Sequence, residues 1–185
     1  MSSAAHAALV AHLLEHSVRT GDFTLKSGKK STWFIDAKQT ACRAEGMLLV
    51  ADVALDEIPD DVTAIGGLTM GADAVAFGIA AIAATRGRAL RSFSVRKEVK
   101  GHGGGGRIAG ALQAGDKVVI TEDAVTRGVS MLEAAAVIRE EGAAVPVLLL
   151  PLVDRGGTVE AMAAEQGLPL RALVTALDLG FPYEG

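Results

Sequence analysis

The sequence predicts an α/β domain in which helices cover both faces of a mainly parallel sheet. From residue 62 onward, short runs of aliphatic and β-branched residues alternate with alanine-rich segments of helical length. Half of the residues are hydrophobic and only 4% are aromatic, which suits helices packed closely on a sheet. The 185 residues contain no repeat or linker, so we expect a single domain over residues 1–185.

Three elements are expected before this alternation begins. A helix starts at Ser2 or Ser3 and runs to about residue 17, with Leu9, Val10, Leu13 and Leu14 on one face. The stretch FTLKSGKKSTWFID is typical of a hairpin, with strands at 23–25 and 32–36 and a turn at 27–29. A helix follows over 43–57. Its candidates for the buried face are Met47, Leu48, Val50, Ala51, Val53 and Leu55.

The alternating part supplies the sheet and its covering helices. The expected strands are 62–65, 90–95, 117–121, 145–153 and 170–175. The expected helices are 72–85, 129–141 and 158–166. Two connections are unusual: the glycine-rich GGLTMG after the first of these strands, and a long loop over 96–110. Ligands of such sheets bind where the strands end, and both loops fall there.

Charge and composition limit the classes of partner. A net charge of −4 disfavours binding to nucleic acid or to an anionic membrane surface. The longest apolar run, 145–153, is about half the ~20 residues that span a bilayer. Charged and histidine residues interrupt the N-terminal apolar residues, unlike a signal peptide. We therefore expect a soluble cytoplasmic protein.

The single cysteine, Cys42, excludes an internal disulfide and favours a reducing compartment. No histidine motif accompanies it, so we expect an inert packing residue and no catalytic thiol.

The stretch VVITEDAVTRGVS, residues 118–130, joins an apolar strand to a loop that opens a helix. Thr126, Gly128 and Ser130 offer hydroxyls and close backbone approach at a helix N-terminus, which suits a phosphate group. The Walker A pattern is absent. Glu122 and Asp123, where the strand stops, can accept hydrogen bonds from ribose hydroxyls or help to hold Mg²⁺. The alternative is a strand end with solvated acids and a capping serine.

The stretch SVRKEVKGHGGGGRIAG, residues 94–110, combines basic side chains with five glycines between 101 and 106. Its basic residues are Arg96, Lys97, Lys100, His102 and Arg107. Glycine at this density opposes regular structure, so a mobile basic lid over a pyrophosphate group is favoured. The alternative is a solvated turn without a ligand.

Two further basic residues lie beside predicted strand ends. Lys26, before the turn of the hairpin, has a fixed backbone and a free ammonium group; taken alone, such a lysine is usually solvated. Arg155 directly follows the strand 145–153, where it can bind a planar carboxylate through two hydrogen bonds. The alternative there is a capping Asp154 beside a solvated Arg155.

These stretches resemble a known family when taken together. VVITEDAVTRGVS is similar to the phosphoribosyl-pyrophosphate (PRPP) signature of type I phosphoribosyltransferases. VRKEVKGHG, FTLKSGKKS and the arginine after VPVLLLPLV resemble motifs of the orotate phosphoribosyltransferases, and they occur in the family's order. The departures are Thr121, Arg127, Thr32 and Met70.

The resemblance implies the type I phosphoribosyltransferase fold, with a small N-terminal hood and a long flexible catalytic loop. It also implies transfer of ribose 5-phosphate from PRPP to orotate, giving orotidine 5′-monophosphate and pyrophosphate in pyrimidine synthesis. The implied partners are PRPP, orotate, Mg²⁺ held mainly through PRPP, and a second copy of the chain whose site the loop enters.

The resemblance assigns roles to individual residues. The implied catalytic residues are Lys26, Lys100 and His102. The implied orotate contacts are Lys26, Thr126 and Arg155. The implied PRPP contacts are Arg96, Lys97, Lys100, His102, Glu122, Asp123, Ala124, Val125, Thr126, Arg127, Gly128, Val129 and Ser130.

Two other functions stay open. A phosphoribosyltransferase for a purine base would gain little from Arg155, because a purine has no carboxylate. A regulator that senses PRPP would need the phosphate cradle but not Lys97, Lys100 and His102 together.

Overall fold

The computed structural model describes residues 3–24, 28, 30–99, 106–141 and 144–184. Its main sheet has the strand order β5-β4-β3-β6-β7-β8. The bounds are β3 (Ala64–Leu68), β4 (Arg91–Val95), β5 (Ile108–Gly110), β6 (Asp116–Val125), β7 (Ala144–Asp154) and β8 (Val174–Thr175). Only β5 pairs antiparallel in this sheet, so the predicted mainly parallel α/β fold is confirmed.

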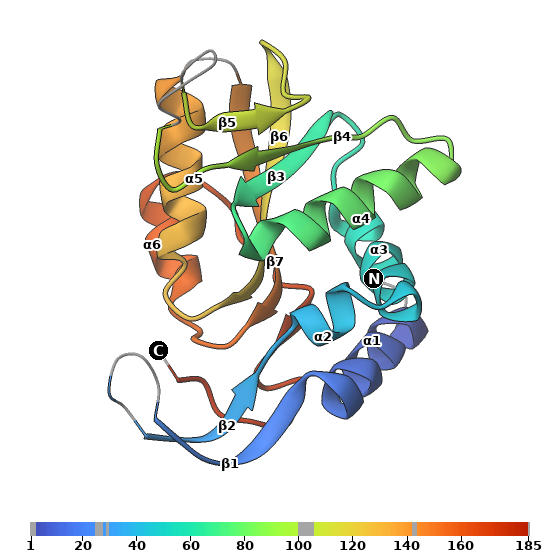
Figure 1. Cartoon of the computed structure of the whole chain (residues 1–185), viewed down its shortest axis with the longest axis vertical. Coiled ribbons are helices and arrows are strands. Elements are labelled where there is room, and N and C mark those ends of the chain that lie inside the picture. The colour runs from blue at the N-terminus through green and yellow to red at the C-terminus, as the bar shows by residue number, and fades with distance from the viewer. Residues whose placement is uncertain (1–2, 25–27, 29, 100–105, 142–143, 185) are drawn as a thin grey trace.

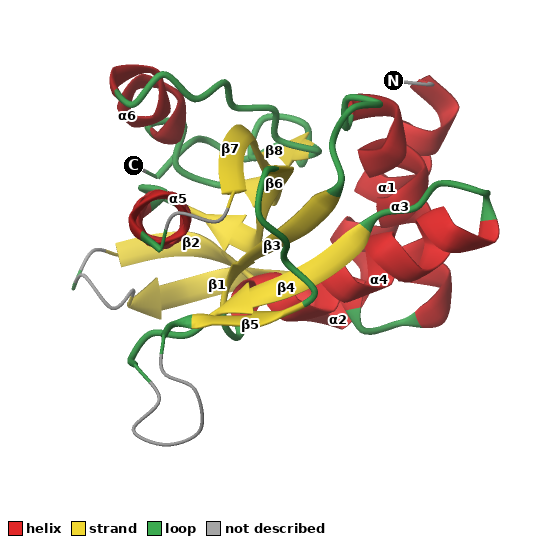
Figure 2. Cartoon of the chain, turned by 90° about the horizontal axis from the view of Figure 1, so that it is seen from above, coloured by secondary structure: helices red, strands yellow, loops and turns green. Residues whose placement is uncertain are grey.

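Helices lie on both faces of the sheet (Figures 1 and 2). One face carries α3 (Ala44–Glu57) and α4 (Gly71–Thr85), with α1 (Ser3–His16) packed on α3. The other carries α5 (Val129–Glu140) and α6 (Val159–Glu165). Each face of the sheet has its own hydrophobic core, and successive residues of β6 point to opposite faces. Val119 packs in the core beneath α3 and α4, whereas Val118 and Ile120 pack in the core beneath α5 and α6. Burial on both faces explains the continuous apolar runs.

The hairpin forms a small layer beyond the ends of β6 and β7 (Figure 1). We call β1 (Val18–Thr24), β2 (Lys30–Ile35) and α2 (Lys38–Ala41) the hood. The hairpin is confirmed, although β1 begins at Val18, several residues earlier than expected. The helix α2 was not predicted, because four residues are too few to show a helical period. Trp33 in β2 is fully buried and fixes the hood against the rest of the chain.

Several strand ends differ from the predictions. Strand β6 continues to Val125, so Glu122 and Asp123 lie within it and not beyond its end. It continues because parallel pairing with β7 persists as far as Val125 and Asp154. Strand β3 likewise extends through Gly66 and Gly67 to Leu68, paired with β4. Pairing with β4 also makes 108–110 a strand, where a loop was expected. The last strand keeps only Val174–Thr175, with an isolated bridge from Leu170 to Leu149.

Three predicted packing residues face solvent. Leu14 and Leu48 are 42% and 51% exposed. The face of each helix that packs against the core is narrower than the positions of its leucines predicted. Cys42 is exposed at the end of α2, so the prediction of a packing residue was wrong. Among the described residues, no helix combines the length and apolar character needed to cross a membrane.

Candidate functional site

The acid pair of β6 faces the N-terminus of α4. A Cβ atom at Gly71, the first residue of α4, would overlap the Glu122 carboxyl and lie 2.8 Å from Oδ1 of Asp123. Both carboxyls therefore lie beside the first turn of α4, and a side chain at Gly71 would displace the Glu122 carboxyl. Unpaired N–H groups and the helix dipole make such a position favourable for negative charge. Glu122 is only 6% exposed and Asp123 only 9%.

The two carboxyls have different surroundings. Asp123 forms an ion pair with Lys38 of the hood. Burial lowers the pKa of Lys38, but the hydrogen bond and charge of Asp123 outweigh it, and the net shift is upward. Burial, and then the charge of Asp123, raise the pKa of Glu122 to about 8, while a hydrogen bond from Ser130 opposes the rise. Near pH 7 Glu122 is thus mostly protonated.

A pH dependence of stability follows from Glu122. The native carboxyl keeps its proton up to pH of about 8, whereas the unfolded chain releases it near 4.5. The Glu122 contribution to the free energy of unfolding is therefore present below pH 4.5 and is lost as pH rises to about 8. We expect the melting temperature of Glu122→Gln to depend less on pH across this window. Thermal unfolding without ligand measures it, with exposed Glu165→Gln as control. Equal pH slopes for Glu122→Gln and the unaltered chain would contradict the assignment.

The segment after β6 has the geometry of an anion cradle. Gly128 has φ 68° in the left-handed region and is the N-cap of α5, so it turns the chain into the helix. Gly128 is buried, whereas Arg127 and Val129 are exposed. The N-terminus of α5 can offer backbone N–H groups to a phosphate. The loop and helix start predicted over Thr126, Gly128 and Ser130 are therefore present.

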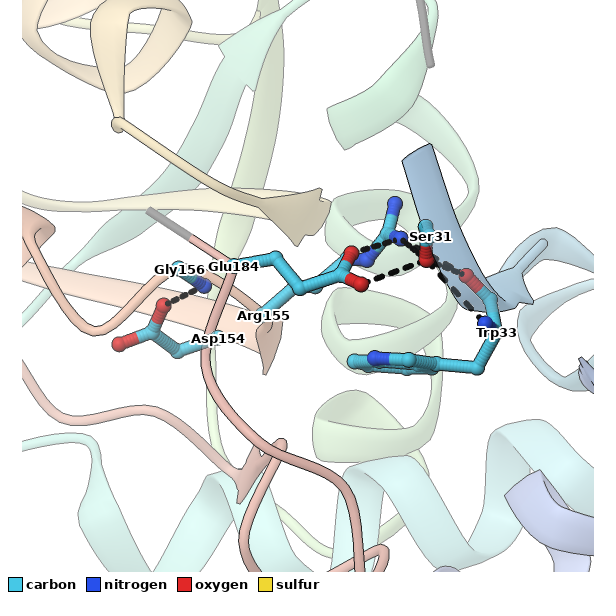
Figure 3. A network of polar contacts seen from close by, with 6 residues as sticks. All are labelled: Ser31, Trp33, Asp154, Arg155, Gly156 and Glu184. Carbon is cyan, nitrogen blue, oxygen red and sulfur yellow. Dashed lines mark hydrogen bonds and ion pairs between the residues drawn. The ribbon is translucent and has the colours of Figure 1, made fainter. Parts of the chain in front are cut away.

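Arg155 lies next to this cradle, at the end of β7 (Figure 3). Its backbone N–H donates to the carbonyl of Val125 at 2.8 Å. A Cβ atom on Gly156 would overlap the carbonyl of Thr126, so the two loops touch through their backbones. Asp154 Oδ1 accepts hydrogen bonds from the N–H groups of Gly156 and Gly157, both at 3.0 Å, which fixes the turn.

The Arg155 side chain is buried and held from several sides. It is 7% exposed, and its guanidinium lies 4.7 Å from the ring centroid of Trp33. Its Nη2 donates to Ser31 Oγ at 3.1 Å and to the Trp33 carbonyl at 2.9 Å, and it pairs with Glu184. The alternative prediction, a capping Asp154 beside a solvated Arg155, is therefore half right. Asp154 does cap the turn, but Arg155 is buried and not solvated.

The remaining basic residues that the sequence predicts for the site are only partly described by the structure. Lys26, Lys100 and His102 lie outside the described residues. Arg96 and Lys97 follow β4, half-buried and exposed respectively. Arg107 is not free to meet a ligand, because it pairs with Glu133 and its Nε donates to the Arg96 carbonyl at 2.6 Å. Its backbone N–H also donates to Glu141.

The loop between β3 and α4 is tied to β4. Thr69 Oγ1 and Ser94 Oγ both donate to the Asp73 carboxylate at 2.7 Å, and the Thr69–Met70 peptide is cis. The Met70 side chain is 72% exposed. This turn therefore presents backbone groups beside the acid pair.

Two residues of the site carry no recognisable signal in the sequence. Lys38 meets Asp123 from the hood, and no motif marked it. Glu184, which pairs with Arg155, lies 29 positions beyond it in the sequence.

Within the described ranges, no group of three or more His, Cys, Asp and Glu side chains is arranged to hold a metal ion. A hollow of about 340 Å³ lies along the hairpin, lined by Asp22, Phe23, Lys30, Ser31 and Thr32.

Asp123→Asn is expected to weaken PRPP binding by roughly 10- to 100-fold. A carboxylate accepts hydroxyl hydrogen bonds worth about 1.5–3 kcal/mol, and an amide replaces one acceptor with a donor. Isothermal titration with PRPP measures the change. Asp52→Asn is the matched control, because Asp52 also forms an ion pair, with Arg86, on the exposed side of α3. Unchanged PRPP affinity in Asp123→Asn would remove the ribose role.

Comparison with known proteins gives the family of the chain. A scan against protein-family profiles finds no match. The orotate phosphoribosyltransferase of Synechocystis sp. is 39% identical over 174 residues, covering 93% of this chain and 87% of that protein. The orotate phosphoribosyltransferase of Corynebacterium glutamicum is also 39% identical, covering 97% and 96%.

A solved structure agrees in fold and in length. The orotate phosphoribosyltransferase of Mycobacterium tuberculosis in complex with PRPP superposes with a TM-score of 0.80 at 27% identity, covering 96% of this chain and 99% of that one. The same enzyme in complex with Fe(III) dicitrate gives 0.83 at 32% identity, with the same coverage. With near-complete coverage and close to two-fifths identity to the Synechocystis and Corynebacterium enzymes, the chain belongs to the orotate phosphoribosyltransferase family.

Proposed function

We propose that the chain transfers ribose 5-phosphate from PRPP to orotate, yielding orotidine 5′-monophosphate and pyrophosphate for pyrimidine biosynthesis. One observation supports this proposal most directly. The Arg155 N–H bonds the Val125 carbonyl at 2.8 Å, so the arginine lies immediately beside the loop that can hold a 5′-phosphate. A phosphate site and a carboxylate-binding arginine at neighbouring strand ends match the two ends of the product.

The acid pair supplies the contacts to the ribose. The Asp123 carboxylate accepts hydrogen bonds from the ribose hydroxyls, and protonated Glu122 can donate one. Lys38 holds the Asp123 carboxylate in place. No covalent nucleophile is required, because an oxocarbenium-like anomeric carbon forms as pyrophosphate leaves. Catalysis is then positioning combined with stabilisation of charge.

The basic residues stabilise the departing pyrophosphate. Arg96 and Lys97 bind PRPP phosphates, and Lys100 and His102 close over the leaving group from the neighbouring subunit of a homodimer. Lys26 contacts the substrates from the hood. Arg155 aligns orotate, with Thr126 as a second contact.

Mg²⁺ enters with PRPP in this proposal, and the acid pair fits it. The charge of Asp123 contributes to the raised pKa of the buried Glu122 carboxyl, so a cation beside the pair would be favoured by charge. Glu122 and Asp123 are the side chains that would face it, directly or through water. Neutralisation of pyrophosphate oxygens is the chemistry that a bound Mg²⁺ would supply. We also infer a cytoplasmic location from the single cysteine and the charge balance.

The test follows the fall in orotate ultraviolet absorbance with purified protein, PRPP and Mg²⁺. EDTA and Lys100→Ala are the negative controls, and adenine, xanthine and uracil are offered in parallel. Metal-dependent loss with orotate alone is the expected result. Turnover of a purine without turnover of orotate would favour the purine enzyme. PRPP binding without turnover of any base would favour the regulator.

A further inference from the structure

The Arg155 guanidinium already holds a carboxylate, that of Glu184 (Figure 3). One oxygen of Glu184 pairs with Nη2 of Arg155, and the other accepts a hydrogen bond from Ser31 Oγ at 2.5 Å. The side chains of Arg155 and Glu184 are only 9% and 15% exposed. A pair so shielded from solvent differs from the weak ion pairs of an exposed surface.

The segment that carries Glu184 is fixed at several points. The Glu184 N–H donates to the Arg155 carbonyl at 3.0 Å. Phe181 stacks on Trp33 with ring centroids 4.7 Å apart and an interplanar angle of 12°. The Tyr183 ring covers Gly157, where a Cβ atom would come within 2.7 Å of it. These contacts hold the Glu184 carboxylate against Arg155 and Ser31.

The donors that Glu184 uses are those that a substrate carboxylate needs. Nη2 of Arg155 and the Ser31 hydroxyl together present two hydrogen bonds to one planar group. Arg155 Nε is buried and has no hydrogen-bond partner among the described residues, so Glu184 leaves part of the guanidinium unsatisfied. Two carboxylates at a single buried arginine would leave one negative charge without compensation, which is strongly unfavourable. Binding of Glu184 and of a substrate carboxylate at Arg155 is therefore mutually exclusive.

We propose that Glu184 is a built-in competitor for the carboxylate subsite and sets the affinity for orotate. The carboxylate of the incoming base displaces that of Glu184 from Arg155 and Ser31, and the segment 181–184 moves aside. This inference rests on the proposed function, in which Arg155 binds the orotate carboxylate. The apparent dissociation constant of orotate then equals the intrinsic constant divided by the fraction of molecules with Arg155 free. PRPP, which binds at the 126–130 cradle, does not compete with Glu184.

Glu184→Gln tests the competition, because glutamine keeps the size of the side chain and loses its charge. We expect the KM for orotate to fall by about tenfold, as the free fraction of Arg155 rises. The KM for PRPP is expected to stay within twofold. Glu165→Gln, a change of the same kind at an exposed position of α6, is expected to alter neither constant. Titration calorimetry with orotate in the presence of pyrophosphate gives the dissociation constant independently of turnover.

Glu184→Asp is the second variant. The shorter side chain retracts the carboxylate from Arg155, so we expect a smaller fall in the KM for orotate, and this variant stands in if glutamine prevents folding. An unchanged or raised KM for orotate in the folded variants overturns the competition. An equal fall in both KM values also overturns it. If the unaltered chain fails to consume orotate at all, the proposed function is overturned instead, so the two failures are distinguishable.

Discussion

Arg155→Ala is expected to lower kcat/KM for orotate by at least about 100-fold while the KM for PRPP stays within about threefold. Loss of one partner of a buried hydrogen-bonded charge pair costs about 2–5 kcal/mol, and each 1.4 kcal/mol is a factor of ten. The buried arginine side chain contacts Ser31 and Trp33 of the hood, whereas its bond to Val125, next to the cradle, comes from the backbone N–H, which alanine preserves. Initial rates with each substrate varied in turn measure the two effects separately.

A second variant separates binding from folding in this prediction. Arg155→Ala leaves the Glu184 carboxylate buried without its cation, so we expect the melting temperature to fall as well. In Arg155→Ala/Glu184→Gln that orphaned charge is gone, so stability should recover while orotate use stays low. Arg86→Ala, which removes an exposed arginine paired with Asp52, is the control. Recovery of orotate turnover in the double variant would contradict a direct role for Arg155.

Gly156→Ala is expected to reduce both stability and PRPP binding. Its Cβ atom would overlap the backbone carbonyl of Thr126, which no side-chain rotation can relieve. Overpacking of this kind costs about 1–3 kcal/mol, and in a domain of this size about 3 kcal/mol lowers the melting temperature by roughly 6–12 °C. The relief must come from moving the 126–130 cradle away from Arg155, so we expect PRPP affinity to fall by at least tenfold. Thermal unfolding and PRPP titration measure the two losses.

Gly167→Ala is the control for this prediction. Gly167 has φ 68°, yet a Cβ atom there would meet nothing within 4 Å, so the change strains the backbone without a clash. We expect a modest loss of stability and unchanged PRPP affinity. If both alanine variants bind PRPP equally well, contact between the two loops is not needed for the cradle.

The order of most strands and helices along the chain was predictable, because each of these elements has its own local pattern of apolar and polar residues. Alternating apolar runs and alanine-rich segments identified strands β3, β4, β6 and β7 and helices α4, α5 and α6, whereas β5 was expected to be loop. The cradle was predictable for the same reason, since Thr126, Gly128 and Ser130 are close in sequence. Strand ends were less predictable, because the length of β6 depends on its pairing with β7 as far as Asp154.

Contacts between distant segments were not predictable. Lys38 and Asp123 are separated by 85 positions, and Ser31 and Glu184 by 153. Neither Lys38 nor Glu184 lies in a recognisable motif, and each becomes part of the site only when the hood and segment 181–184 meet the strand ends. The surroundings of the two acids were hidden as well: adjacent Glu122 and Asp123 look equivalent in the sequence, yet burial raises the pKa of Glu122 to about 8 and Lys38 pairs with Asp123.

The stack of Trp33 on Phe181 has a spectroscopic consequence. Trp33 is the single tryptophan of the chain, and its ring contacts both Phe181 and the guanidinium of Arg155. Its intrinsic emission therefore reports on one place, the contact between the hood and segment 181–184. A shift to longer wavelength would mark water reaching the indole as that contact opens. The protein thus carries its own fluorescent probe beside the proposed base site, and opening can be timed by stopped flow without any label.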